Sequence, residues 1–129
     1  ILGDNIFQDK IKFSNIVWGA MIYLKPVPDP ERFGVATIKD DNIISIIEKP
    51  KKTTSYYAVT GLYIYDNSVF DKIRELKPSK RGELEITDVN NAYLKEGALD
   101  FRILTGFWTD AGTVESLYRA TTLVRETHK

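Results

Sequence analysis

The chain has 129 residues, which suits one domain of ordinary size, and it carries 18 Lys and Arg against 18 Asp and Glu. This zero net charge argues against a protein that binds nucleic acid by neutralising its phosphates. The lack of Cys excludes disulfides and thiol nucleophiles, and the single His, His128, cannot build a multi-His metal site. No apolar run approaches the roughly 20 residues that span a bilayer, so we expect a cytoplasmic protein that binds neither membrane nor nucleic acid.

The chain opens on two apolar residues, Ile1 and Leu2, followed by Gly, Asp and Asn. This pattern is typical of the last step of a buried strand that runs into a loop. Two residues are too few for a strand, so we expect the chain to be a piece whose earlier residues completed that strand. The alternative is that residues 1–5 form a loose tail. Residues 6–18 show neither a helical nor a strand period.

Strand-like segments dominate the first half, where apolar and β-branched residues lie between prolines and polar turns. Residues 19–25 form an apolar run that prolines end. The polar turn 39–42 joins 35–38 to 43–47, which predicts a hairpin. Residues 57–65, rich in Val, Thr and Tyr, are predicted to form the longest strand.

Helices enter in the second half, which predicts an α/β layered domain with a mixed sheet and about three helices. Asp66 is suited to cap a helix that Pro78 ends, and a second helix is predicted over 83–96. A strand over 99–104 and a last helix over 113–126 follow. The residues expected to face inward are Val69, Phe70, Ile73 and Leu76 in the first helix, Ile86, Val89, Tyr93 and Leu94 in the second, and Val114, Leu117, Tyr118 and Val124 in the third.

Two aspartates are candidates for holding a cation. Asp4 comes directly after the predicted opening strand, at the kind of sheet edge where α/β proteins bind ligands, and a carboxylate there suits Mg²⁺. Asp110 follows an aromatic pair and precedes a small Gly-containing turn that a ligand could approach closely. The structural alternatives are a turn residue for Asp4 and the N-cap of the last helix for Asp110.

Two cationic side chains are candidates for a phosphate site. Lys49 ends the hairpin beside Glu48, where it could reach a phosphate, and the alternative is a surface ion pair. Arg81 follows Lys80 just before a predicted helix N-terminus, where the helix dipole also favours anions. Carboxylates for a metal and cations for phosphate, without a usable nucleophile, are typical of phosphoryl or nucleotidyl transfer, in which positioning and charge neutralisation supply the catalysis.

Six motifs occur in the order found in glucose-1-phosphate thymidylyltransferases, so the chain resembles these sugar nucleotidyltransferases over nearly its whole length. They are Leu2-Gly3-Asp4-Asn5, Pro28-Asp29-Pro30-Glu31-Arg32-Phe33-Gly34-Val35, Glu48-Lys49-Pro50, Tyr57-Ala58-Val59-Thr60-Gly61-Leu62-Tyr63, Arg81-Gly82-Glu83-Leu84-Glu85-Ile86-Thr87-Asp88 and Trp108-Thr109-Asp110-Ala111-Gly112-Thr113. The resemblance implies a partial Rossmann-like α/β/α fold, with residues 1–129 as one domain that forms the sugar-phosphate-binding part.

The family reaction implies the substrates: glucose 1-phosphate is joined to dTTP, a nucleoside triphosphate, to give dTDP-glucose and pyrophosphate. By resemblance, Asp4 and Asp110 hold Mg²⁺ against the phosphate. Lys49 and Arg81 hold the sugar phosphate, and these four residues are implied to be catalytic. The residues implied to bind the substrate are Gly34, Glu48, Lys49, Val59 and Arg81, with Gly34 and Val59 acting through backbone groups.

The family's Gly-rich loop, which cradles the triphosphate in its N-terminal nucleotide-binding half, has no counterpart in this sequence. The segment between Phe7 and Gly19 is also shorter than the family pattern. We therefore expect the parent enzyme to be active and this chain alone to be inactive. The alternatives are a uridylyltransferase-type relative and a non-catalytic sugar-phosphate-binding module. The unpaired edge strand of a half-sheet is prone to pair with a second copy of the chain, so a homo-oligomer is a further alternative.

Overall fold

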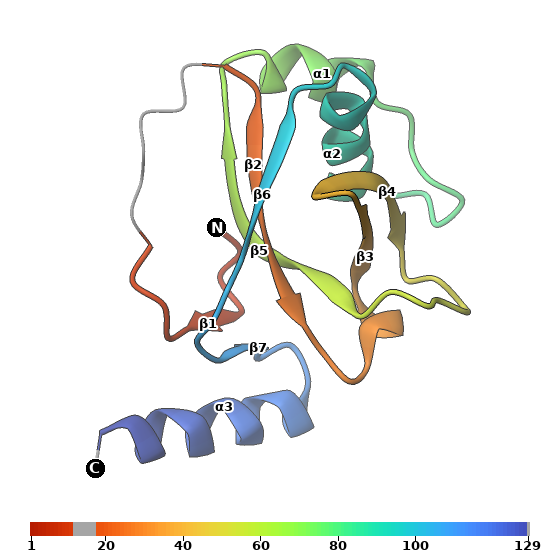
Figure 1. Ribbon diagram of the computed structural model, residues 1–129. Coiled ribbons are helices and arrows are strands. Elements are labelled where there is room, and N and C mark those ends of the chain that lie inside the picture. The colour runs from red at the N-terminus through yellow and green to blue at the C-terminus, as the bar shows by residue number, and fades with distance from the viewer. Residues whose placement is uncertain (12–17, 129) are drawn as a thin grey trace.

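A curled mixed sheet forms the body of the protein in the computed structural model, which describes residues 1–11 and 18–128 (Figure 1). Five strands in the described part of the chain form this sheet: β2 (Ala20–Pro26), β3 (Gly34–Lys39), β4 (Asn42–Glu48), β5 (Tyr57–Tyr65) and β6 (Leu99–Ile103). They lie in the order β4-β3-β5-β2-β6, and only β2 and β6 run parallel. The predicted α/β class with a mixed sheet is confirmed.

Strands β2 and β5 form the core because both are covered on both faces. Successive side chains of a strand point to opposite faces, so Met21 and Tyr23 pack into one apolar cluster and Ile22 and Leu24 into another. A strand buried on both faces needs a continuous apolar run, which is the pattern that β2 shows. The two strands predicted over 19–25 and 57–65 are confirmed.

The predicted hairpin is also present. Asp40 and Asp41 have φ of 50° and 59°, as a two-residue turn between twisted antiparallel strands requires. At the open end of the hairpin, Gly34 of β3 lies opposite Glu48 of β4. This register carries Glu48 and the following Lys49 toward the candidate site described below.

Helix α2 (Ile86–Lys95) packs against the sheet, as the buried side chains of Val89 and Tyr93 show. It begins later than the predicted residue 83, because Glu85 keeps an extended backbone and is itself the residue before the first helical turn. Ile86 was expected to face inward, but it is 37% exposed. The helix ends just before Gly97, as predicted.

Helix α1 (Val69–Glu75) contributes little to the core. Phe70 and Ile73, which were expected to face inward, are 61% and 40% exposed, and no residue of the helix is fully buried. Ser68 directly precedes the helix, but its own backbone is helical and its side chain makes no capping bond. Asp66, the predicted cap, accepts the Ser68 N–H through its carboxylate and also bonds to other parts of the fold.

Asp66 joins three parts of the fold through hydrogen bonds. Its Oδ2 accepts the Gly19 N–H at 2.7 Å, and its Oδ1 accepts the Ser68 N–H at 3.0 Å and the Tyr93 hydroxyl at 2.8 Å. The Ser68 hydroxyl also donates to Oδ1 at 2.6 Å. These donors favour the charged form, with the Ser68 hydroxyl first among them, and they lower the pKa of Asp66 to about 2.

We expect Asp66→Asn to lower the free energy of unfolding at pH 7 by about 1–2 kcal/mol, because charge-assisted hydrogen bonds to three elements are weakened. Because the pKa is lower in the folded chain, this contribution is present above about pH 4 and is lost as the pH falls toward 2. Urea denaturation at pH 7 and at acid pH measures the difference between the two proteins, which should shrink at acid pH. Asp71→Asn is the control, because Asp71 makes only an exposed pair with Arg74. A difference that stays constant with pH would contradict the prediction.

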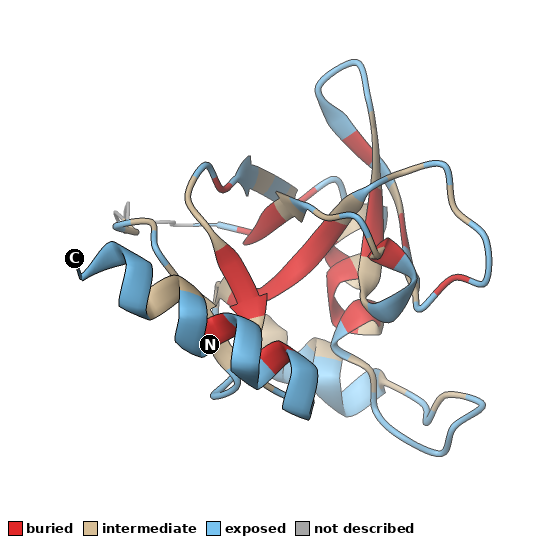
Figure 2. Ribbon diagram, turned by 90° about the horizontal axis from the view of Figure 1, so that it is seen from below, coloured by how far each residue is buried: buried red, intermediate tan, exposed pale blue. Residues whose placement is uncertain are grey.

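The inward face predicted for the last helix is wrong at three of its four residues, and the fourth, Val124, is half-buried. Helix α3 (Val114–Thr127) buries Ser116 and Ala120, whereas Val114, Leu117 and Tyr118 are 89%, 53% and 72% exposed (Figure 2). Ser116 and Ala120 lie one turn apart, and their small side chains form the strip that meets the rest of the fold. None of the described helices is long and apolar enough to cross a membrane.

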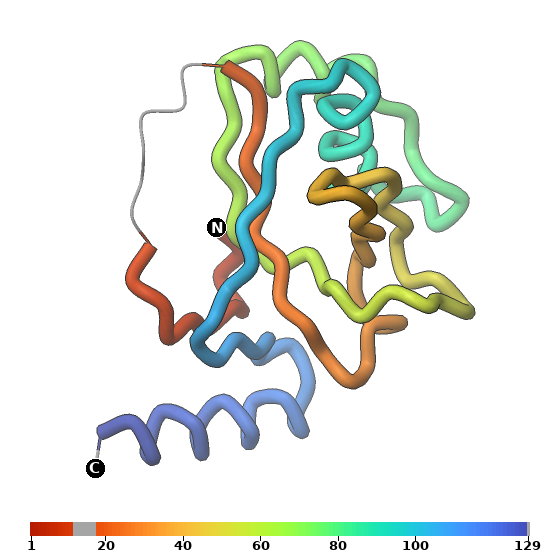
Figure 3. Tube along the Cα trace, in the orientation of Figure 1, coloured from red at the N-terminus to blue at the C-terminus, as the bar shows by residue number. Residues whose placement is uncertain are grey.

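The N-terminal segment is not a loose tail, and its first two residues form no strand in this chain. Ile1 and Leu2 are exposed, yet the Leu2 N–H donates to the Gly61 carbonyl at 2.8 Å. Strand β1 (Asn5–Phe7) follows and pairs antiparallel with β7 (Trp108–Asp110), so a segment near the start of the sequence lies beside one near its end (Figure 3). Residues 12–17, in the segment predicted to be shortened, lie outside the described residues.

Candidate functional site

A cleft of about 590 Å³ opens between the end of the β3–β4 hairpin, strand β5 and the β1–β7 pair. Six of the seven predicted site residues line it, and Arg81 does not. The six are Asp4, Gly34, Glu48, Lys49, Val59 and Asp110. Residues from both ends of the chain thus share one cleft with the hairpin.

The carboxylates of Asp4 and Asp110 come together across the β1–β7 pair, in which Asn5 lies opposite Asp110. A Cβ built on Gly112 would lie 3.2 Å from Oδ2 of Asp4 and 3.5 Å from Oδ2 of Asp110, so both oxygens border the same small space. The sequence suggested that Asp4 follows a strand. In the structure Asp4 instead precedes one, because β1 begins at Asn5.

The space beside Gly112 suits a hard divalent cation, because carboxylate oxygens are the ligands that such cations prefer. Within residues 1–11 and 18–128, no three His, Cys, Asp or Glu side chains gather to form a complete protein cage. Two carboxylates that leave positions for phosphate oxygens and water are the usual arrangement for Mg²⁺. The donor set of Asp4 and Asp110 therefore fits this ion.

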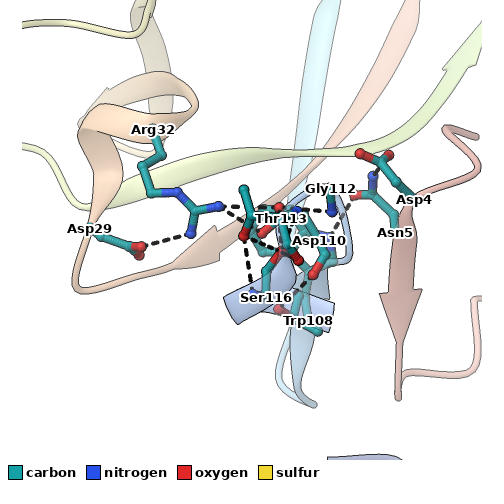
Figure 4. Close-up of polar contacts among 10 residues, drawn as sticks. Asp4, Asn5, Asp29, Arg32, Trp108, Asp110, Gly112, Thr113 and Ser116 are labelled. Atoms are coloured by element: carbon teal, nitrogen blue, oxygen red, sulfur yellow. Dashed lines mark hydrogen bonds and ion pairs between the residues drawn. The ribbon is translucent and has the colours of Figure 1, made fainter. Parts of the chain in front are cut away.

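Asn5 ties the Asp4 side of the cleft to the core (Figure 4). Its Oδ1 accepts the Gly61 N–H at 2.9 Å and the Trp108 indole N–H at 2.7 Å, and its Nδ2 donates to Oδ1 of Asp4 at 2.9 Å. A Cβ on Gly61 would lie only 2.6 Å from Nδ2 of Asn5, so this close approach needs a glycine. Sequence reasoning missed Asn5, although it directly follows a candidate ligand.

The last helix does not need Asp110 as its N-cap. Thr113 holds that position, and its hydroxyl accepts the Ser116 N–H at 3.1 Å in a reciprocal capping box. Asp110 instead accepts the Ser116 hydroxyl at 3.1 Å and the Gly112 N–H at 3.3 Å through Oδ2. The structural alternative for Asp110 is therefore wrong, and its carboxylate is held toward the cleft.

Arg32 is a second residue that sequence reasoning missed. It ends the short 3₁₀ helix η1 (Pro30–Arg32), and its guanidinium lies 3.0 Å from Asp29 and 3.2 Å from Asp110. The hydrogen bond to Asp29 is the largest of the effects that raise the pKa of Arg32, and Asp110 adds to it. Arg32 also lines the cleft.

Glu48, Thr87 and Tyr63 bring polar groups to the middle of the cleft. The Thr87 hydroxyl donates to Oε2 of Glu48 at 2.5 Å, which fixes the carboxylate of Glu48. Burial raises the pKa of Tyr63 to about 12, and the nearby charges of Glu48 and Asp4 add to this effect. Tyr63 therefore keeps its proton at neutral pH and can donate a hydrogen bond.

Lys49 has a left-handed backbone, with φ of 41°, which side-chain-bearing residues seldom adopt. Its N–H donates to the Phe33 carbonyl at 3.0 Å, so the bend is held against the loop before β3. Among the ion pairs of the described residues, none joins Lys49 to Glu48, and Oε2 of Glu48 accepts the Thr87 hydroxyl. Strained backbone of this kind is often found at functional sites.

We expect Lys49→Gly to be more stable than Lys49→Ala by about 1 kcal/mol, because glycine adopts this backbone without strain. Urea denaturation of both variants measures the difference. The same pair of substitutions at Lys39, an exposed strand residue, is the control and should give the opposite order. A less stable glycine variant at both positions would contradict the assignment of strain to Lys49.

Arg81 lies in a depression of about 440 Å³ that adjoins the cleft and shares Glu48, Lys49 and Thr87 with it. Its guanidinium is 3.1 Å from Glu83 and 3.7 Å from Glu85, and its side chain is half exposed. The expectation that it stands just before a helix is wrong, since α2 begins at Ile86. The side chain is nevertheless close to the part of the cleft that Lys49 borders.

The family model for nucleotidyl transferases matches residues 3–127, which is nearly the whole chain. The chain belongs to this nucleotidyl transferase family. A glucose-1-phosphate thymidylyltransferase of Neisseria gonorrhoeae is 46% identical over 134 residues, and the nucleotidyltransferase Agl11 of Haloferax volcanii, named for low-salt glycan biosynthesis, is 39% identical over 132. Each match covers 97% of this nucleotidyltransferase chain.

Two solved structures superpose well on this chain. A Bacillus anthracis protein assigned as a glucose-1-phosphate thymidylyltransferase and crystallised with sucrose is 58% identical, with a TM-score of 0.89 over 97% of this chain and 53% of its own. An apo UDP-glucose pyrophosphorylase is 24% identical and has a TM-score of 0.73 over 86% of this chain and 44% of its own, so it shares the fold. The chain spans 46% of the Neisseria relative and 37% of Agl11.

Proposed function

We propose that this chain forms the sugar-phosphate and cation side of a glucose-1-phosphate thymidylyltransferase, which joins glucose 1-phosphate to dTTP and releases pyrophosphate. The observation that carries the proposal is the shared cleft, in which Asp4 and Asp110 face the same space as Lys49 and Glu48. Two carboxylates and an ammonium in one cleft suit a metal and a phosphate bound next to each other. The Neisseria gonorrhoeae relative, which is 46% identical to this chain, is named for the same reaction.

Several polar groups of the cleft have a role in this proposal. The Lys49 ammonium holds the phosphate of the sugar, while Glu48, fixed by Thr87, accepts hydrogen bonds from sugar hydroxyls. Tyr63, protonated at neutral pH, donates to another hydroxyl. Asp4 and Asp110 would hold Mg²⁺, which when bound neutralises charge on the phosphate oxygens. The attacking phosphate oxygen is already an anion, so these residues need only to bind and orient it.

Calorimetric titration in the presence of Mg²⁺ tests the proposal. We expect glucose 1-phosphate to bind at least tenfold more tightly than glucose or inorganic phosphate alone, because it engages both Lys49 and the sugar pocket. Glucose provides the control for the sugar contacts and inorganic phosphate the control for the charge. Equal affinity for inorganic phosphate and glucose 1-phosphate would contradict a sugar pocket, and no binding of either would contradict the whole proposal.

A further inference from the structure

Arg32 bridges two carboxylates at the edge of the cleft (Figure 4). Its Nη1 donates to Asp29 at 3.0 Å, and its Nη2 donates to both oxygens of Asp110 at 3.2 and 3.3 Å. The guanidinium carbon also lies 5.0 Å from the centre of the Phe33 ring. A positive charge therefore already sits on the carboxylate that we assign to a divalent cation.

The Asp110 contact is the one that a cation would disturb. The side chain of Asp110 is only 15% exposed, so solvent screens its charges less than it would on the surface. A divalent cation bound to Asp110 would repel the guanidinium at short range and compete with it for the same oxygens. Asp29 and the Phe33 ring would still hold Arg32 after it leaves Asp110.

We propose that Arg32 is a positioning residue that holds Asp110 in the cation-free protein and yields it when a divalent cation binds between Asp4 and Asp110. This inference rests on the proposed function, because it takes these two aspartates as the cation ligands. Arg32 keeps the Asp110 carboxylate ordered and neutralised until the cation arrives. The same contact weakens cation binding, because it must first be broken.

Binding of Mn²⁺, measured from the electron paramagnetic resonance signal of the free ion, tests this without any turnover. We expect Arg32→Met to bind Mn²⁺ about tenfold more tightly than the wild-type chain, because a competing positive charge is gone. Arg74→Met is the matched control: it removes an exposed arginine whose pair with Asp71 lies on α1, and it should bind Mn²⁺ as the wild type does. Arg32→Lys keeps a charge and should stay within about twofold of the wild type.

Asp110→Asn tests the cation site separately from the role of Arg32. It should weaken Mn²⁺ binding in the wild-type chain and remove the gain of Arg32→Met. Suppose that Asp110→Asn weakens Mn²⁺ binding but Arg32→Met does not tighten it. This result would overturn the role proposed for Arg32 and would leave the cation site in place. If Asp110→Asn has no effect on Mn²⁺ binding, the cation assignment fails and the inference falls with it. Equal tightening by Arg32→Lys and Arg32→Met would overturn competition by charge.

Discussion

Asn5→Ala is expected to lower the free energy of unfolding by about 2–4 kcal/mol, which is a large part of the stability of a domain of this size. The substitution removes the acceptor of two N–H groups, those of Gly61 and the Trp108 indole, which lie on separate elements. Each buried donor left without a partner costs about 1–3 kcal/mol. The fold should also lose the link that holds Asp4 beside β5, because Nδ2 of Asn5 donates to that carboxylate.

Urea denaturation followed by tryptophan fluorescence measures this effect, with Asn42→Ala as the control. Asn42 makes one exposed hydrogen bond in the hairpin turn, so its loss should cost well under 1 kcal/mol. Asn5→Asp distinguishes the effect on stability from the effect on the Asp4 carboxylate. It keeps an oxygen for both N–H groups but replaces the N–H donor to Asp4 with a second negative charge. We expect Asn5→Asp to be more stable than Asn5→Ala. An Asn5→Ala chain as stable as the wild type would show that water replaces the amide.

The strands that the sequence predicts well are those bounded by prolines or by turn residues. Prolines end β2, and the Asp40–Asp41 turn joins β3 to β4, so local chemistry sets their bounds. β5 carries nine residues suited to a strand, and its bounds agree with the prediction. In these segments, local preference and tertiary packing favour the same structure.

The faces of the outer helices were predicted only in part, because they depend on what lies beside them: in α1, Val69 and Leu76 pack against the core as predicted, whereas Phe70 and Ile73 are exposed. In α3 the apolar residues Val114, Leu117 and Tyr118 follow a helical spacing, which favours an inward stripe. The neighbouring surface instead meets Ser116 and Ala120, whose small side chains allow close approach. Periodicity therefore identified the helix and gave the wrong face.

Most of the residues that line the cleft could be singled out from the sequence, but the contacts between them could not. Short motifs marked Asp4, Glu48, Lys49 and Asp110, and antiparallel pairing of β1 with β7 brings the first and last of these together. Nothing local distinguishes Arg32 from other loop arginines, because its partner Asp110 is far away in the sequence. Contacts between distant segments decide which charges meet.

The largest expected change in ligand binding comes from the two candidate phosphate cations. Lys49→Met should weaken the binding of glucose 1-phosphate by tenfold or more, because a charge-assisted hydrogen bond to phosphate is worth roughly 1.5–3 kcal/mol. The methionine keeps the length and apolar stem of the lysine, so packing changes little. Lys39→Met, at the far end of β3 from the cleft, is the control and should leave the affinity unchanged. Calorimetric titration of each variant measures the effect.

Arg81 is expected to add a second cation at the junction of the cleft and the adjoining depression, which share Lys49. To reach a phosphate there, Arg81 must leave Glu83, and this exposed ion pair costs little to break. Arg81→Ala should therefore weaken glucose 1-phosphate binding by about tenfold, and Arg81→Lys should not restore it fully, because lysine lacks the two-pronged donor geometry. Unchanged affinity of Arg81→Ala, with Lys49→Met still weakened, would leave Arg81 as a surface partner of Glu83 and make Lys49 the main cation for the phosphate.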